Sequence, residues 1–138
     1  MKNTISILVV DDEAVMRSLL EKILVREGYN VRTADHGLSA LDILAQEKID
    51  IVLSDMKMPH MNGFELLKRI RKDYRNVGVI IMTAYGDTYT VKDALLLGAD
   101  EYITKPFNSY EVTLVVERAY WRILSGRNPA METSSAKD

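Results

Sequence analysis

The chain contains no cysteine among its 138 residues, and it lacks long apolar runs and a strong excess of charge of either sign. Without cysteine it can form no disulfide, no thiolate zinc site and no cysteine nucleophile, which suits a reducing cytoplasm. No apolar run approaches the roughly 20 residues that a membrane-spanning helix needs, and the N-terminal stretch has no small-residue cleavage site of a secretion signal. Basic and acidic side chains number 18 and 20, which argues against direct binding of nucleic acid by this domain. We therefore expect a cytoplasmic protein without a membrane segment.

The composition is that of one folded globular domain. Apolar residues make up 47% of the chain and charged residues 28%, and the length fits a single hydrophobic core. Helical periodicity ends near Ser125, after which Ser, Thr, Gly, Pro and charged residues dominate. We therefore expect a domain over residues 1–124 and a flexible tail, or the start of a linker, over residues 125–138.

Short β-branched runs alternate with longer stretches of helical spacing, five times over. This alternation predicts an α/β fold, a doubly wound parallel sheet with helices on both faces. The first, third and fourth runs are nearly all apolar, as is typical of strands that are buried on both faces. Strands are expected at Ser6–Val10, Asn30–Ala34, Ile49–Ser54, Val77–Met82 and Glu101–Thr104, and helices at Val15–Leu24, Leu38–Glu47, Phe64–Ile70, Thr88–Leu97 and Val112–Ile123.

Local signals agree with these boundaries. Gly28 and Gly98 follow helical stretches, where a left-handed residue commonly ends a helix. Two asparagines, each with a glutamate three residues later, have the spacing of a capping box that starts a helix: Asn62 with Glu65, and Asn108 with Glu111.

Polar side chains that could take part in binding or catalysis follow four of the expected strands. Asp11 and Asp12 come after the first strand, Asp55 after the third, Thr83 after the fourth and Lys105 after the fifth. In a parallel sheet these strand ends share one edge, where ligands bind in such folds. We therefore expect three carboxylates, one hydroxyl and one ammonium group to converge on one pocket.

Three neighbouring carboxylates require a compensating charge. Each pair repels by roughly 4 kcal/mol at 4 Å and an effective dielectric of 20, and a Mg²⁺ or Mn²⁺ ion with oxygen ligands would relieve this. His36 and His60 lie outside the set, which leaves no soft ligand for zinc. Lys105 and Thr83 would then suit the binding of phosphoryl oxygens, with Asp55 as a nucleophile that forms an acyl phosphate.

The residues of these strand ends resemble those of response-regulator receiver domains of two-component signalling, the CheY-like superfamily. The resemblance covers about residues 4–124. The matching segments are Ile7-Leu8-Val9-Val10-Asp11-Asp12-Glu13, Leu53-Ser54-Asp55-Met56-Lys57-Met58-Pro59 with Asn62-Gly63, Met82-Thr83-Ala84 and Lys105-Pro106-Phe107.

The resemblance implies a phosphoacceptor and its metal site. Asp55 would accept a phosphoryl group from a sensor histidine kinase, in a Mg²⁺-dependent reaction that the domain itself promotes, as it does the later loss of the group. The chain would therefore be a signalling switch and not an enzyme. Asp11, Asp12 and Asp55 would bind the metal, with the backbone carbonyl of Lys57 as a further ligand.

The resemblance also implies a switch and a fold. Lys105 would contact the phosphoryl group, Thr83 would turn inward to bond it, and Tyr102 would move with Thr83. Strand order 2-1-3-4-5, as in flavodoxin, and a cis bond between Lys105 and Pro106 are implied as well. The amino-acid sequences of these segments are most similar to those of receivers attached to transcriptional activators. The output would then pass through a C-terminal domain, or through a homodimer formed by the fourth helix, fifth strand and fifth helix.

Two other functions fit parts of the pattern. A Mg²⁺-dependent phosphohydrolase could use the same aspartyl-phosphate chemistry, although such enzymes often carry a second aspartate where this chain has Lys57. A flavin or nucleotide binder would need a Gly/Ser/Thr-rich loop after the first strand, and here that loop is acidic.

Single residues also have plainer interpretations. An acidic pair such as Asp11 and Asp12 is often only favourable charge at a helix start, and threonine is common in strands. We expect His36 and His60 to be surface residues. Trp121 is expected to pack against the core or a linker, although its region, with Leu96 and Tyr102, is also a candidate docking surface.

Overall fold

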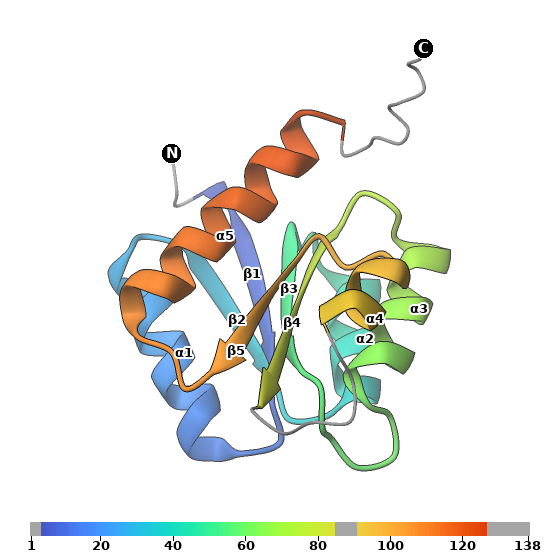
Figure 1. Cartoon of the computed structure of the whole chain (residues 1–138), viewed down its shortest axis with the longest axis horizontal. Coiled ribbons are helices and arrows are strands. Elements are labelled where there is room, and N and C mark those ends of the chain that lie inside the picture. Colours follow the sequence, from blue (N-terminus) through green and yellow to red (C-terminus); the bar gives the residue numbers. More distant parts are fainter. Residues whose placement is uncertain (1–3, 85–90, 127–138) are drawn as a thin grey trace.

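The computed structural model of the protein describes residues 4–84 and 91–126, which form a parallel five-stranded sheet between two layers of helices (Figure 1). The strand order is β2-β1-β3-β4-β5, which confirms the doubly wound α/β fold and the implied order. The strands are β1 (Ser6–Val10), β2 (Asn30–Ala34), β3 (Ile51–Asp55), β4 (Gly78–Ala84) and β5 (Glu101–Lys105).

The helices divide between the two faces of the sheet (Figure 1). Buried side chains of α1 and α5 pack on one face, and those of α2, α3 and α4 on the other. The helices are α1 (Ala14–Arg26), α2 (Gly37–Gln46), α3 (Gly63–Asp73), α4 (Val91–Leu96) and α5 (Ser109–Leu124). Among the described residues, none of these helices is long and apolar enough to cross a membrane.

The continuous apolar run of β1 follows from its place inside the sheet. Successive side chains of a strand point to opposite faces, so Ile7 and Val9 join the core under α1 and α5, while Leu8 and Val10 join the core under α2 and α3. All four side chains are fully buried. β2, which lies at the edge of the sheet, instead alternates exposed residues with more buried ones.

The predicted capping boxes and the predicted helix-ending glycines are present in the structure. Asn62 accepts a hydrogen bond from the backbone N–H of Glu65 at 2.9 Å, and the Glu65 carboxylate accepts from the backbone N–H of Asn62 at 2.8 Å. Asn108 and Glu111 make the same reciprocal pair at the start of α5. Both glycines that were expected to end helices have left-handed backbones, with φ of 98° and 97°.

Three strands extend further toward their carboxyl ends than the apolar pattern predicts. Asp55 is the last residue of β3, Thr83 lies inside β4, and Lys105 is the last residue of β5. The reason is that pairing between strands continues through these polar residues, with Asp55 opposite Met82 and Lys105 opposite Ala84. The prediction that they follow their strands was therefore wrong by one or two residues, and they are held by the sheet itself.

Some boundaries differ for other reasons. β3 begins at Ile51 and not at Ile49, because the Asp50 carboxylate accepts a hydrogen bond from the backbone N–H of Ser6 at 2.8 Å and stands outside the strand. The expected start of the fourth helix at Thr88 lies outside the described residues, and so does most of the expected tail over residues 125–138.

A buried ion pair ties α3 to the amino-terminal ends of β4 and β5. The guanidinium group of Arg71 donates to the Asp100 carboxylate at 2.5 Å and to the carbonyls of Gly98 and Val77 at 2.9 and 2.6 Å. The same Asp100 oxygen accepts from the backbone N–H of Val79 at 2.8 Å. The side chain of Asp100 is only 2% exposed, so its charge depends on these partners.

Replacement of Arg71 should therefore destabilise the fold. Arg71→Met leaves a buried carboxylate without its cation, and we expect a loss of about 3 kcal/mol in the free energy of unfolding. Urea denaturation followed by circular dichroism measures this change. Arg69→Met, at an exposed position of the same helix, is the control and should shift the midpoint little; equal shifts in both variants would contradict the role of the pair.

Candidate functional site

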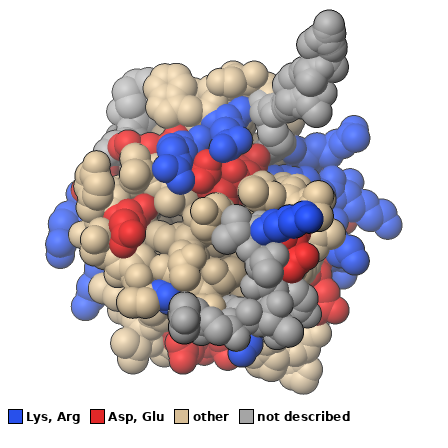
Figure 2. Space-filling view, in the orientation of Figure 1, with Lys and Arg blue, Asp and Glu red and all other residues tan. Residues whose placement is uncertain are grey.

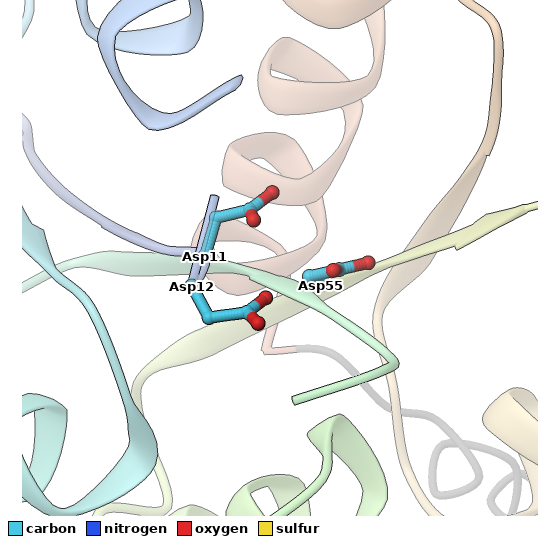
Figure 3. A group of neighbouring side chains, drawn as sticks. All are labelled: Asp11, Asp12 and Asp55. Carbon is cyan, nitrogen blue, oxygen red and sulfur yellow. The ribbon is translucent and has the colours of Figure 1, made fainter. Parts of the chain in front are cut away.

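Three carboxylates converge at the carboxyl edge of the sheet. Asp11 and Asp12 follow β1, and Asp55 ends the neighbouring strand β3, so that their side chains share one small region (Figure 3). One oxygen from each carboxylate lies within 4.8 Å of the others. Asp11 and Asp55 are buried, whereas Asp12 is exposed. The group is therefore open to solvent on one side and enclosed by protein on the other.

Lys105 brings a positive charge to this group from the end of β5. Its ammonium nitrogen lies 3.2 Å from Oδ1 of Asp55 and 3.7 Å from Oδ2 of Asp11. The shorter distance is a hydrogen bond that Lys105 donates, and the longer one is only an ion pair. One cation thus stands beside two buried carboxylates, which leaves the local charge negative.

Every polar atom of Asp11 except one takes part in a hydrogen bond. Its backbone N–H donates to the carbonyl of Ala34 at 3.1 Å, its own carbonyl accepts from Arg17 at 2.7 Å, and its Oδ1 accepts from the backbone N–H of Glu13 at 2.9 Å. Among the described residues, Oδ2 of Asp11 is the buried side-chain oxygen that lacks any hydrogen-bond partner. An unsatisfied buried carboxylate oxygen is costly, and a bound cation would satisfy it.

Burial shifts the acid–base properties of both enclosed carboxylates. Desolvation raises the pKa of Asp55 from its ordinary value of 3.8 to about 6; Lys105 lowers it, and the charge of Asp11 adds to the rise. Desolvation likewise raises the pKa of Asp11, against the hydrogen bond from Glu13 and the charge of Lys105. Because like charges crowd a poorly hydrated site, its ionised form is disfavoured until a cation is present.

The residues present fit a hard divalent cation. All the donor atoms of the acidic group are carboxylate oxygens, which are the ligands that Mg²⁺ and Mn²⁺ prefer. The oxygen of Asp11 without a partner lies beside them, and the exposed side of Asp12 leaves room for water ligands. The acidic group could therefore hold a metal ion.

The other predicted residues lie on β4, on β5 and in the segments that follow β3 and β5. Thr83 is 5% exposed near the end of β4, the strand that pairs with both β3 and β5. Tyr102 is half-buried and lines a groove of about 260 Å³ between β5 and α5. Lys57 is exposed in the loop after Asp55, and the peptide bond between Lys105 and Pro106 is cis.

Both histidines are exposed, as expected. His36 caps the start of α2, where its Nδ1 accepts from the backbone N–H of Ser39 at 3.2 Å. His60 lies in the loop after β3 with a left-handed backbone, φ 70°. Neither belongs to the acidic group.

Sequence reasoning missed the residues that orient the carboxylates. The guanidinium group of Arg17 donates a hydrogen bond to the carbonyl of Asp11, and the hydroxyl of Ser54 donates one to the carbonyl of Asp55 at 3.0 Å. No sequence signal marks either residue, because the Arg17 contact spans six positions and the Ser54 contact is made to the carbonyl of the next residue.

The raised pKa of Asp55 makes the stability of the protein depend on pH. A carboxyl group whose pKa is higher in the folded than in the unfolded chain binds its proton more tightly when folded, so raising the pH from 3.8 to about 6 lowers the free energy of unfolding. Asp55→Asn cannot ionise. In a chelator, we expect it to be more stable than the wild type above pH 6, by up to about 3 kcal/mol.

Denaturation at a series of pH values tests this expectation. The difference between Asp55→Asn and the wild type should shrink as the pH falls toward 4, where both side chains are neutral. Asp12→Asn, at the exposed carboxylate, should give a much smaller difference. A stability gap that is independent of pH would show that ionisation of Asp55 is not its cause.

Comparisons with known proteins agree with this geometry. The chain matches the family model of the response regulator receiver domain over residues 7–117. It is 44% identical to sporulation initiation phosphotransferase F of Bacillus subtilis (strain 168) over 112 residues, which are 81% of this chain and 90% of that protein. It is 40% identical to regulatory protein AtoC of Escherichia coli (strain K12) over 113 residues, 82% of this chain but only 24% of AtoC.

Solved structures show the same fold. The crystal structure of a response regulator receiver domain protein from Clostridium thermocellum superposes with a TM-score of 0.80 and 33% identity, covering 86% of this chain and 95% of that one. Family model, sequence relatives and sheet topology all point the same way, and the chain belongs to the response regulator receiver domains of two-component signalling.

Proposed function

We propose that the protein is a phosphorylation-activated switch in which Asp55 accepts a phosphoryl group from a sensor histidine kinase. The observation that carries this proposal is the surroundings of Asp55. It ends a central strand with Lys105 at 3.2 Å and with Asp11 and Asp12 beside it. A buried carboxylate with an adjacent cation and further acidic ligands is suited to forming an acyl phosphate.

Asp11, Asp12 and Asp55 would hold Mg²⁺, with Mn²⁺ as a substitute. The backbone carbonyl of Lys57 would be a further ligand, on the resemblance to other receiver domains. The bound cation would supply charge stabilisation for the oxygens of the incoming phosphoryl group and offset the repulsion among the carboxylates.

Asp55 and Lys105 would carry out the phosphoryl transfer itself. A carboxylate oxygen of Asp55 attacks phosphorus while the phosphorus–nitrogen bond of the donor phosphohistidine breaks, and the departing imidazole nitrogen takes up a proton. Lys105 is already hydrogen-bonded to Asp55. As negative charge moves from the carboxylate to the phosphoryl oxygens, its ammonium group would bind those oxygens instead. Attack needs the ionised carboxylate, and with a pKa of about 6 Asp55 is mostly ionised at neutral pH.

Thr83 and Tyr102 would transmit the change. A phosphoryl group adds roughly −1.5 to −2 charges, and the hydroxyl of Thr83 would turn to bond one of its oxygens. Tyr102 would then move within the groove between β5 and α5, which it already lines. To convert such a switch from 1:99 to 99:1, phosphorylation must favour the active state by about 5.5 kcal/mol.

The output surface would be the one formed by α4, β5 and α5. Leu96 and Trp121 are 74% and 66% exposed there. Of the two expectations for Trp121, packing against the core was therefore wrong, and packing against a linker concerns residues outside those described. On β5 and α5, Glu101 is buried and pairs with Arg118 and Arg122 at 2.8 and 2.9 Å. Figure 2 shows acidic and basic groups adjoining one another in the upper part of the view, among side chains without charge. Apolar groups beside paired charges suit a homodimer contact.

Control of transcription is the proposed setting, inside the cytoplasm. AtoC and the DNA-binding transcriptional regulator NtrC of Escherichia coli (strain K12) are much longer than the segments that match this chain, which cover 24% of each. A domain over residues 1–124, followed by a linker, would control such an output domain. The similarity to a phosphotransferase over 90% of its length favours a second candidate, in which Asp55 passes its phosphoryl group to another protein.

A phosphohydrolase remains the alternative from a different class. The exposed Lys57 stands two residues after Asp55, where such an enzyme would often carry its acid. Turnover distinguishes the two functions, because an enzyme consumes added phosphomonoester catalytically and a stoichiometric phosphoacceptor does not.

Binding of Mg²⁺ should stabilise the folded protein. At a concentration 100 times the dissociation constant, the free energy of unfolding should rise by about 2.7 kcal/mol. Thermal denaturation with and without MgCl₂ measures this rise. Asp11→Asn should abolish it, and Asp73→Asn, which changes an exposed carboxylate at the far end of α3, should retain it. Equal responses of the two variants would place the cation elsewhere.

Acetyl phosphate with Mg²⁺ should label one residue. Mass spectrometry of the intact protein should show one added phosphate on the wild type and on Asp73→Asn, and none on Asp55→Ala or in the presence of a chelator. Label that persists on Asp55→Ala would reject Asp55 as the acceptor.

A further inference from the structure

The first turn of α3 lies directly against the peptide group of Asp55. Gly63 begins this helix, and a Cβ atom at this position would stand 2.6 Å from the carbonyl oxygen of Asp55 and 3.0 Å from Cα of Met56. A contact of 2.6 Å between carbon and oxygen is far inside their normal separation, so a side chain here requires the backbone to move. The backbone of Gly63 does not have a positive φ, and close approach alone therefore explains the glycine.

The backbone around Asp55 is fixed between this helix and β4. The backbone N–H of Met56 donates to the carbonyl of Met82 at 2.9 Å, and the carbonyl of Met56 accepts from the N–H of Gly63 at 2.8 Å. The hydroxyl of Ser54 donates to the carbonyl of Asp55 at 3.0 Å. The peptide that follows Asp55 is thus bonded on both sides, and the helix can withdraw only by breaking one of these contacts.

The position of this peptide determines where the Asp55 carboxylate points. The carboxylate lies 3.2 Å from the Lys105 nitrogen and shares a region of 4.8 Å with the oxygens of Asp11 and Asp12. Group transfer is sensitive to such geometry, and a misplacement of 1 Å can cost on the order of 100-fold in rate.

We propose that Gly63 is a positioning residue for the phosphoacceptor: its missing side chain lets α3 seat the peptide of Asp55 so that the carboxylate faces Lys105 and the metal ligands. This inference rests on the proposed function of Asp55, and it adds a residue that touches neither phosphoryl group nor metal.

Gly37 provides a matched control within the same chain. It begins α2 as Gly63 begins α3, and a Cβ atom there would also have its nearest neighbour at 2.6 Å. The three nearest atoms, however, all belong to the side chain of Met61: its sulfur and Cγ can rotate away, and its Cβ lies at 3.1 Å. The same substitution therefore displaces a side chain at one helix start and the backbone of Asp55 at the other.

The experiment compares Gly63→Ala with Gly37→Ala and the wild type. Labelling by acetyl phosphate is followed at saturating Mg²⁺, well below the melting temperature of each protein, and Mg²⁺ affinity is measured by calorimetry. We expect Gly63→Ala to be labelled at least about 10-fold more slowly, and Gly37→Ala to keep the wild-type rate within about 2-fold. Because Asp11 and Asp12 are unchanged, the Mg²⁺ dissociation constant of Gly63→Ala should change by less than the rate does.

The outcomes separate this inference from the proposed function. If Gly63→Ala only weakens the fold, its folded molecules will be labelled at the wild-type rate and the inference fails, while the function of Asp55 stands. If the wild type itself takes up no label on Asp55, the proposed function fails first. Should Gly63→Ala unfold in buffer, an osmolyte such as trimethylamine N-oxide, added equally to all three proteins, restores the compact state for the same comparison.

Discussion

The crowding of three carboxylates around one lysine is the constraint on which the site depends. Asp11 and Asp55 are buried, so they lose hydration, and Lys105 compensates only part of their charge. Such a group is unfavourable by itself and favours any ligand that brings positive charge. The cation binding and the reactivity of Asp55 that we propose would both follow from the same unfavourable burial.

The rest of the fold holds these charges together against their repulsion. β1 and β3 are central strands, with neighbours on both sides, and their ends cannot separate without breaking the ladder. Arg17 fastens the carbonyl of Asp11 from α1, and α3 closes on the peptide of Asp55 through Gly63. At the opposite edge, Arg71 and Asp100 tie α3 to β4 and β5. Contacts from α1 and α3 thus hold the charged edge in place, while α4 and α5 carry exposed apolar side chains such as Leu96 and Trp121.

Sequence patterns predicted the elements better than their ends. The boundaries of β1 and β2 were correct to the residue, because apolar periodicity and turn residues mark them. Asp55 and Lys105 were expected to follow their strands, since a charged residue normally ends an apolar run. Pairing with the neighbouring strand extended both strands through these residues, and that pairing depends on residues distant in sequence.

By itself, the sequence determined the alternation of elements, the caps of α3 and α5, and the identity of the acidic and basic groups at one edge. These features depend on side-chain periodicity, local hydrogen bonds and the common direction of parallel strands, all of which can be read along the chain. Only the tertiary structure decided that Lys105 bonds Asp55 and not Asp11, that one oxygen of Asp11 lacks a partner, and that Gly63 touches the Asp55 carbonyl. Such contacts arise from packing between distant segments, where differences of half an ångström separate a bond from its absence.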